Sequence, residues 1–76
     1  MARYFFHVND SAEMLDSEGV ELRGPDQAGA MAIVASGEAL KDLGRRFWAN
    51  PEWRMWVTDE NGAKVCSLTI SAERGA

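Results

Sequence analysis

The stretch from Trp53 to Ile70 constrains the fold more than any other part of the chain. It contains two runs of strand-forming residues joined by the dipeptide Asn61-Gly62. An Asn-Gly pair between two such runs is typical of a tight hairpin, because both residues of that turn must adopt positive φ. We therefore predict a β-hairpin whose turn determines which side chains lie opposite one another.

The predicted register divides the hairpin into two faces, because successive side chains of a strand point to opposite sides of a sheet. The opposed pairs are Trp53 with Ile70, Met55 with Leu68, Val57 with Cys66, Thr58 with Val65, and Asp59 with Lys64. One face is apolar and is expected to lie beneath a helix; its residues are Trp53, Met55, Val57, Cys66, Leu68 and Ile70. The other face carries Arg54, Trp56, Thr58, Val65, Ser67 and Thr69.

A helix is predicted between about Pro25 and Leu43. Proline suits the first helical position, and Asp26 places a negative charge at the positive end of the helix dipole. Apolar side chains then recur at three- and four-residue steps, which indicates one buried stripe. The stripe consists of Ala28, Met31, Ala32, Ala35, Ala39 and Leu43. Because most of these side chains are small, the large residues of the sheet must supply most of the core.

The N-terminal third is expected to be extended. Arg3–Asn9 is rich in aromatic and β-branched residues, which favours a strand. A second extended segment is expected over Glu13–Leu22, interrupted by a turn at Asp16-Ser17-Glu18-Gly19. Together these elements predict the α+β class: one small domain over residues 1–76, in the order β-β-α-β-β, with a mainly antiparallel sheet and one helix on one face. Residues 71–76 are expected to form a loose tail.

A candidate partner face follows from the alternation of side chains along both strand pairs. If Tyr4, Phe6 and Val8 join the core, the residues between them point the other way. In a single sheet, the face without the helix then carries Phe5, His7, Trp56 and Val65. Aromatic side chains of this size can form a functional surface patch. Three readings remain open: a loop at residues 48–52 or the tail covers the patch, a protein docks there, or nucleic-acid bases stack there.

The composition limits the classes of partner. The net charge is −4, which is unfavourable for binding a phosphate backbone, so nucleic acid is not the expected partner. The chain has one cysteine, which excludes an intrachain disulfide, and a domain of 76 residues has a small core. Small domains of this kind are often stabilised by a second copy of themselves. No apolar run approaches the length of a membrane span, and we expect a cytoplasmic protein.

The sequence offers little catalytic chemistry. His7 is the only histidine, and a strand histidine beside aromatic residues is more often a packed or surface residue than a catalytic one. Cys66 falls on the predicted core face, where a thiol behaves as a small apolar group. The acidic residues between Asp10 and Glu21 lack the spacing of a calcium loop. We therefore expect no enzyme, no catalytic residue, no metal, no cofactor and no small-molecule substrate.

Three motifs resemble a widespread family of short bacterial proteins classed as a domain of unknown function. The motifs are the opening Arg3-Tyr4-Phe5-Phe6-His7-Val8 with Asp10, the turn Asp16-Ser17-Glu18-Gly19, and the run from Trp56 to Gly62. The resemblance covers nearly the whole chain and implies no established activity and no catalytic residues. The residues themselves favour a small interaction or regulatory module that binds a protein partner or a second copy of itself. The alternative is a module that binds single-stranded nucleic acid through the aromatic side chains of its sheet.

Overall fold

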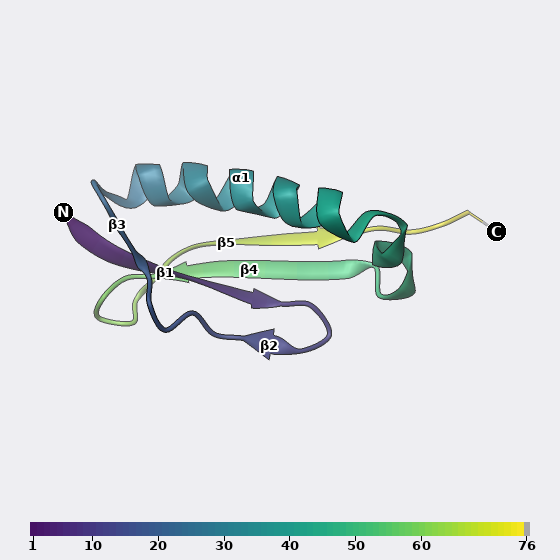
Figure 1. Cartoon of the computed structure of the whole chain (residues 1–76), viewed down its shortest axis with the longest axis horizontal. Coiled ribbons are helices and arrows are strands. Elements are labelled where there is room, and N and C mark those ends of the chain that lie inside the picture. The colour runs from purple at the N-terminus through teal and green to yellow at the C-terminus, as the bar shows by residue number, and fades with distance from the viewer. Residues whose placement is uncertain (76) are drawn as a thin grey trace.

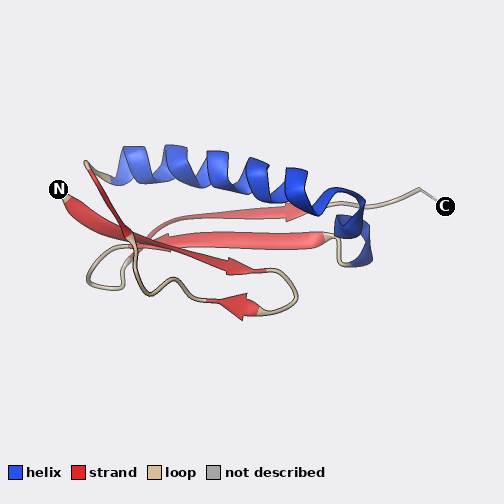
Figure 2. Cartoon of the chain, in the orientation of Figure 1, coloured by secondary structure: helices blue, strands red, loops and turns tan. Residues whose placement is uncertain are grey.

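The computed structural model describes residues 1–75 and contains one long helix packed on an antiparallel sheet (Figures 1 and 2). The elements are β1 (Ala2–Asn9), β2 (Glu13–Met14), β3 (Val20–Leu22), α1 (Pro25–Leu43), the 3-10 helix η1 (Gly44–Ala49), β4 (Glu52–Thr58) and β5 (Lys64–Ser71). The predicted α+β class is confirmed. The second extended segment forms two short strands instead of one, so the order is β-β-β-α-β-β.

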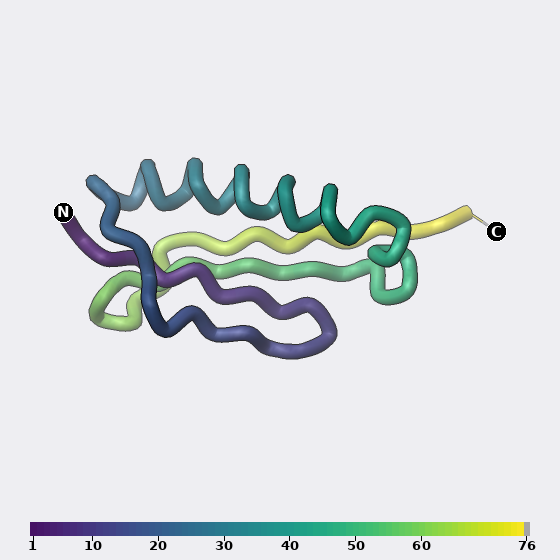
Figure 3. Tube along the Cα trace, in the orientation of Figure 1, coloured from purple at the N-terminus to yellow at the C-terminus, as the bar shows by residue number. Residues whose placement is uncertain are grey.

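The sheet has the strand order β2-β1-β4-β5, and β3 pairs with β1 on the same edge as β2. All pairings are antiparallel. One edge of the sheet is therefore formed by β2 and β3, and the opposite edge by β5. The chain is elongated, with extents of 48 × 21 × 17 Å. Its N-terminus lies near the start of α1, and the segment that follows β5 extends beyond the far end of the helix (Figure 3).

The pairing of β1 with β4 fixes which side chains enter the core. Phe6 lies opposite Val57 and Val8 lies opposite Met55. Val57 and Met55 are buried, and Phe6 and Val8 pack against them. The predicted orientation of the first strand and of the apolar hairpin face is confirmed, with Trp53, Met55 and Val57 as the most buried residues of β4.

Helix α1 has the predicted bounds and packs on β4 and β5 through small side chains. Ala28, Ala32 and Ser36 are buried at four-residue spacing, which lets the helix lie close to the sheet. Met31 was expected in this stripe, but it lies at the stripe's margin and is exposed. The buried Ser36 hydroxyl is satisfied by donating to the Ala32 carbonyl at 2.7 Å. Within residues 1–75, no helix is long and apolar enough to cross a membrane.

The hairpin turn differs from the prediction. Asn61 does not have positive φ, and only Gly62 of the pair does, at 81°. The N–H of Asp59 donates to the Ala63 carbonyl at 3.0 Å, which closes a loop of three residues instead of two. The Asp59 carboxylate also accepts the N–H groups of Asn61 and Ala63, at 2.9 and 3.0 Å. These side-chain bonds stabilise a turn ending in a glycine with positive φ, one residue longer than the predicted one.

The extra residue of the turn is accompanied by a β-bulge in the same hairpin, where β4 and β5 meet the turn. From Trp53–Ile70 to Val57–Cys66 the register is the predicted one, but Thr58 then pairs with Lys64. The predicted pairs of Thr58 with Val65 and of Asp59 with Lys64 are therefore wrong. Val65 is the extra residue at the bulge, where alternation is interrupted. It packs against the buried core and not on the face opposite the helix, which corrects its assignment to the candidate partner face.

The C-terminal residues are attached to the domain rather than loose. Ser71 belongs to β5, and the N–H of Ala72 donates to the Pro51 carbonyl at 3.1 Å. Further along, the Arg74 guanidinium lies 4.7 Å from the ring centre of Trp48, within the range of a cation–π contact. The expected loose tail is thus wrong for Ser71 and Ala72, and Ala76 lies outside the described residues.

The small side chains beneath α1 set the distance between the helix and the sheet. We expect Ala32→Leu to lower the free energy of unfolding by about 1–3 kcal/mol, because Ala32 has no exposed surface and a larger side chain must push the helix away. Ala30→Leu, at an exposed position of the same helix, should change it by less than about 0.5 kcal/mol. Urea unfolding followed by tryptophan fluorescence checks this, and equal effects of the two variants would contradict it.

Candidate functional site

Three of the four predicted partner-face residues come together on the side of the sheet away from α1. His7 lies directly opposite Trp56, and their ring centres are 5.3 Å apart. Phe5 lies on the same side of β1 as His7, opposite Thr58. The Arg54 guanidinium lies 5.5 Å from the ring centre of Trp56. All three aromatic residues are half-buried, so the patch is smaller than the sequence suggested.

The segment Asp16–Gly19 accounts for part of this burial. A Cβ atom placed on Gly19 would stand 2.9 Å from the Phe5 ring, 2.9 Å from the Arg3 side chain and 2.9 Å from the Tyr4 carbonyl. Gly19 also has a φ of 72°, which side-chain-bearing residues rarely adopt. The connection between β2 and β3 therefore presses its backbone against the sheet at Phe5. Neither of the expected covers, the loop at residues 48–52 or the tail, makes this contact.

The Asp16 carboxylate holds this segment in place by accepting three backbone N–H groups. One oxygen accepts the N–H of Phe6 at 3.1 Å, in the gap of β1 between its pairings with β2 and β3. The other oxygen accepts the N–H groups of Glu18 and Gly19, at 3.0 and 3.1 Å. The carboxylate thus replaces a strand partner on one side and closes a turn on the other.

The His7 ring is bonded at both nitrogens. The backbone N–H of Asp16 donates to Nδ1 at 3.1 Å, so Nδ1 carries no proton in this arrangement. The proton then lies on Nε2, which is 2.9 Å from the Thr58 hydroxyl oxygen and donates to it. A general base needs a lone pair that faces a substrate. Here the free lone pair of the ring is already used by the backbone, and His7 links Asp16 to β4.

The pKa of the Asp16 carboxyl is lower than its ordinary value. Burial of the group raises the pKa, but the hydrogen bonds donated by the N–H groups of Phe6, Gly19 and Glu18 lower it by more, with a smaller lowering from the nearby His7 ring. Each of these interactions favours the ionised carboxylate, and together they outweigh the loss of solvation. Asp16 is therefore held as an anion whose bonding capacity is directed to the chain itself.

The acidic segment between Asp10 and Glu21 also contacts Arg3 of β1. Glu21 pairs with Arg3 at 3.1 Å in an exposed ion pair, and Arg3 also donates to the Glu18 carbonyl at 2.8 Å. Exposed pairs of this kind contribute little stability individually. Within residues 1–75, no cluster of histidine, cysteine and carboxylate side chains has the geometry to hold a metal ion.

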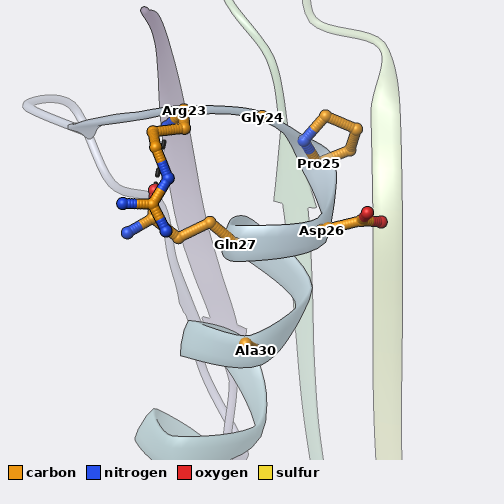
Figure 4. A pocket seen from close by; sticks show the side chains of 6 residues that line it. All are labelled: Arg23, Gly24, Pro25, Asp26, Gln27 and Ala30. Carbon is orange, nitrogen blue, oxygen red and sulfur yellow. Dashed lines mark hydrogen bonds between the residues drawn. The ribbon is translucent and has the colours of Figure 1, made fainter.

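A shallow hollow lies at the start of α1 (Figure 4). Its lining residues are Arg23, Gly24, Pro25, Asp26, Gln27 and Ala30. The Gln27 side chain accepts the N–H of Arg23 at 2.9 Å and occupies one side of it. The remaining groups are exposed and do not converge, so this hollow provides no built site.

The sequence reasoning missed the roles of Asp16 and Gly19, although both belong to a motif that it singled out. An aspartate followed three residues later by glycine is the composition of a turn closed by the carboxylate. What the motif did not show is that the same carboxylate also reaches the neighbouring strand. That contact depends on the tertiary packing of the β2–β3 connection against β1.

The model of a family described as a domain of unknown function (DUF6894) matches residues 3–71. The chain therefore belongs to this family, as its motifs indicated. No curated protein and no solved structure matches the chain. The matched range includes all of the strands except Ala2, so the family corresponds to the complete sheet with its helix.

Gly19 is the residue at which the fit of the β2–β3 connection can be tested. We expect Gly19→Ala to lower the free energy of unfolding by about 2 kcal/mol or more, because a Cβ atom there meets a backbone carbonyl and requires positive φ. Gly24→Ala is the control, since its φ of 175° is extended and nothing lies within 4 Å of the added atom. Thermal unfolding by circular dichroism measures both, and a neutral Gly19→Ala would contradict the described contact.

Asp16 should make stability depend on pH in acid. Because its pKa is lowered by folding, its contribution is complete above the ordinary pKa of about 3.9 and is lost as the pH falls through the lowered value. We expect Asp16→Asn to destabilise the protein by about 2 kcal/mol at neutral pH, and the difference from wild type to shrink toward pH 2. Glu18→Gln, a charge change at an exposed neighbour, is the control. A difference that stays constant from neutral pH to acid would refute this role of the carboxylate.

Proposed function

We propose that the protein is a small protein–protein interaction module whose binding surface is the free edge of strand β5. The supporting observation is the position of β5 at the end of the sheet, where it pairs with β4 on one side only. Natural sheets usually protect an exposed edge with charges, proline, a bulge or a covering element. In β5, which is eight residues long, the one charged residue is Lys64 and the bulge is at Val65, so the run from Cys66 to Ser71 has no charge, no proline and no bulge. A partner strand can extend the sheet at such an edge.

The backbone groups that a partner would meet can be identified. The N–H of Ala72 donates to Pro51, so the residues in phase with Ala72 direct their backbone groups toward β4. Backbone direction alternates along a strand, and Ser67, Thr69 and Ser71 therefore direct their N–H and C=O groups to the free edge. Their side chains are exposed and small, which leaves these backbone groups accessible.

The β5 edge is more accessible to a partner than the aromatic face. Phe5 lies under the backbone at Gly19 and His7 is bonded at both nitrogens, so little of this face is available to a partner. The same features, with the net charge of −4, reduce the support for stacking single-stranded nucleic acid on these rings. Trp56, flanked by Arg54, is the part of the face adjacent to the β4–β5 pair and can lie at the margin of a bound protein.

Photocrosslinking in cells tests whether the β5 edge contacts a protein. We expect a photoreactive amino acid in place of Thr69 to form an adduct, either with a second copy or with another protein identified by mass spectrometry. The adduct should disappear when Ser67→Pro removes an outward N–H group, a change that an edge strand tolerates. The same probe at Lys41, an exposed position on the helix, is the matched control. Adducts that form equally at both positions, or that persist with Ser67→Pro, would contradict the proposal.

A further inference from the structure

We propose that the partner at this edge is a second copy of the chain: β5 pairs antiparallel with β5 of the copy, and the two α1 helices pack side by side across the same axis. This inference rests on the proposed function of the β5 edge and names its occupant. The register of β5, the position of α1 over the sheet and the two helix glycines Gly29 and Gly37 support a second copy as the partner.

The two faces of β5 match those of the copy when one residue of β5 lies opposite the same residue of the copy. Residues directly opposed in an antiparallel pair point to the same face, so residues in phase with Leu68 must meet residues in phase with Leu68. With Leu68 at the axis, Cys66 lies opposite Ile70 of the copy, and both face the helices. Ser67 then lies opposite Thr69 of the copy, and their outward backbone groups form the new hydrogen bonds. Lys64 also comes close to Glu73 of the copy, a pairing of opposite charges.

The position of α1 brings the two helices to packing distance. The helix packs on both β4 and β5, and neighbouring strands are about 4.8 Å apart. A helix between β4 and β5 lies about 5 Å from an axis on the outer side of β5, so the two helices of a dimer would lie about 10 Å apart. Packed helices in proteins are separated by 8–10 Å. Because α1 runs in the same direction as β5, the two helices are antiparallel (Figure 1).

The flank of α1 that faces β5 carries no charged side chain in the middle of the helix. Figure 4 shows Asp26 on the side of the helix toward β5 and Gln27 on the side toward β1. Residues seven positions apart share a side of a helix, so Ile33 and Leu40 follow Asp26. Ile33 is 60% exposed in the single chain, so an apolar side chain on this flank is available for contact with a second helix.

Gly29 and Gly37 border the same flank. In a helix interior, glycine is less favourable than alanine, so a retained glycine calls for a packing reason. Among residues 1–75 there is none, because nothing lies within 4 Å of a Cβ atom added at either position. Two glycines beside Ile33 and Leu40 leave room for the backbone of a second helix.

A single two-fold axis can serve both contacts, because the middle of the α1 contact lies at the same height along the strand as Leu68. The Ser36 hydroxyl lies 3.8 Å from the Met55 sulfur, and Met55 is paired with Leu68. The axis at Leu68 therefore passes the helix near Ser36 and Gly37. Ile33 and Leu40 are equally distant from that point, so Ile33 of each copy meets Leu40 of the other. Gly37, which has no side chain, lies where the two helices come closest.

The surface area of the chain is consistent with a missing partner. Monomeric proteins of 8.4 kDa have an accessible surface of about 4,600 Å², whereas this chain exposes 5309 Å². The excess of about 700 Å² is close to the roughly 800 Å² that each partner buries in a standard interface.

Sedimentation analysis of the purified protein, from micromolar to millimolar concentration, tests the inference. We expect the wild type to have twice the mass of the 8.4 kDa chain. Ile33→Glu should lower the association constant by about 100-fold or more, because it places two carboxylates in the helix contact. Val34→Glu is the matched control: Val34 is the adjacent residue, is also 60% exposed, and lies on the Gln27 side of the helix. It should leave association unchanged.

Ser67→Pro gives a second variant that does not alter the helix and should cause the same loss of association. Circular dichroism of each variant confirms that it is folded. A wild type that stays monomeric at every concentration overturns the inference, as does equal weakening by Ile33→Glu and Val34→Glu. A monomer in solution that forms a crosslink with another protein at Thr69 in cells overturns the second copy as partner but supports the proposed function. A monomer without any such crosslink overturns both.

Discussion

The antiparallel pairing of β1 with β4 is the constraint on which the rest of the structure depends. It places Phe6 and Val8 with Val57 and Met55 beneath α1, and His7 with Trp56 on the opposite face. Because β1 and β4 occupy the centre of the sheet, every other strand is added to one side or the other of this pair. A slip of one residue in this register would exchange the two faces and expose the core.

The two edges of the sheet differ in whether other elements pair with their backbone groups. On the β1 side, two short strands and the Asp16 carboxylate between them supply partners for the backbone of β1, and Gly19 lets this segment lie against Phe5. On the β5 side, no element of residues 1–75 covers the backbone groups of Ser67, Thr69 and Ser71. A chain that closes one edge with specific side-chain bonds and leaves the other regular and uncharged from Cys66 to Ser71 can continue the sheet at the open edge.

Local patterns predicted much of this arrangement and failed where distant contacts decide. Pro25 and the small-residue stripe gave the bounds of α1, and alternation gave the buried face of β4, because both depend only on neighbouring residues. The turn at Asn61-Gly62 was predicted one residue too short, since the Asp59 carboxylate binds Asn61 and Ala63 and stabilises the longer loop. At the resulting bulge, Val65 is partly buried and packs against the core. The bonds from Asp16 to Phe6 and His7 join residues nine and ten positions apart, and only the folded sheet brings them together.

The central claim is that the outward backbone groups of β5 are paired with a second copy, and amide hydrogen exchange measures this residue by residue. In concentrated protein, the account predicts that the amides of Ser67 and Thr69 are protected as strongly as those of Leu68 and Ile70. On dilution below the dissociation constant, Ser67 and Thr69 should exchange quickly while Leu68 and Ile70 remain protected by β4. Rapid exchange of Ser67 and Thr69 at every concentration would contradict the account.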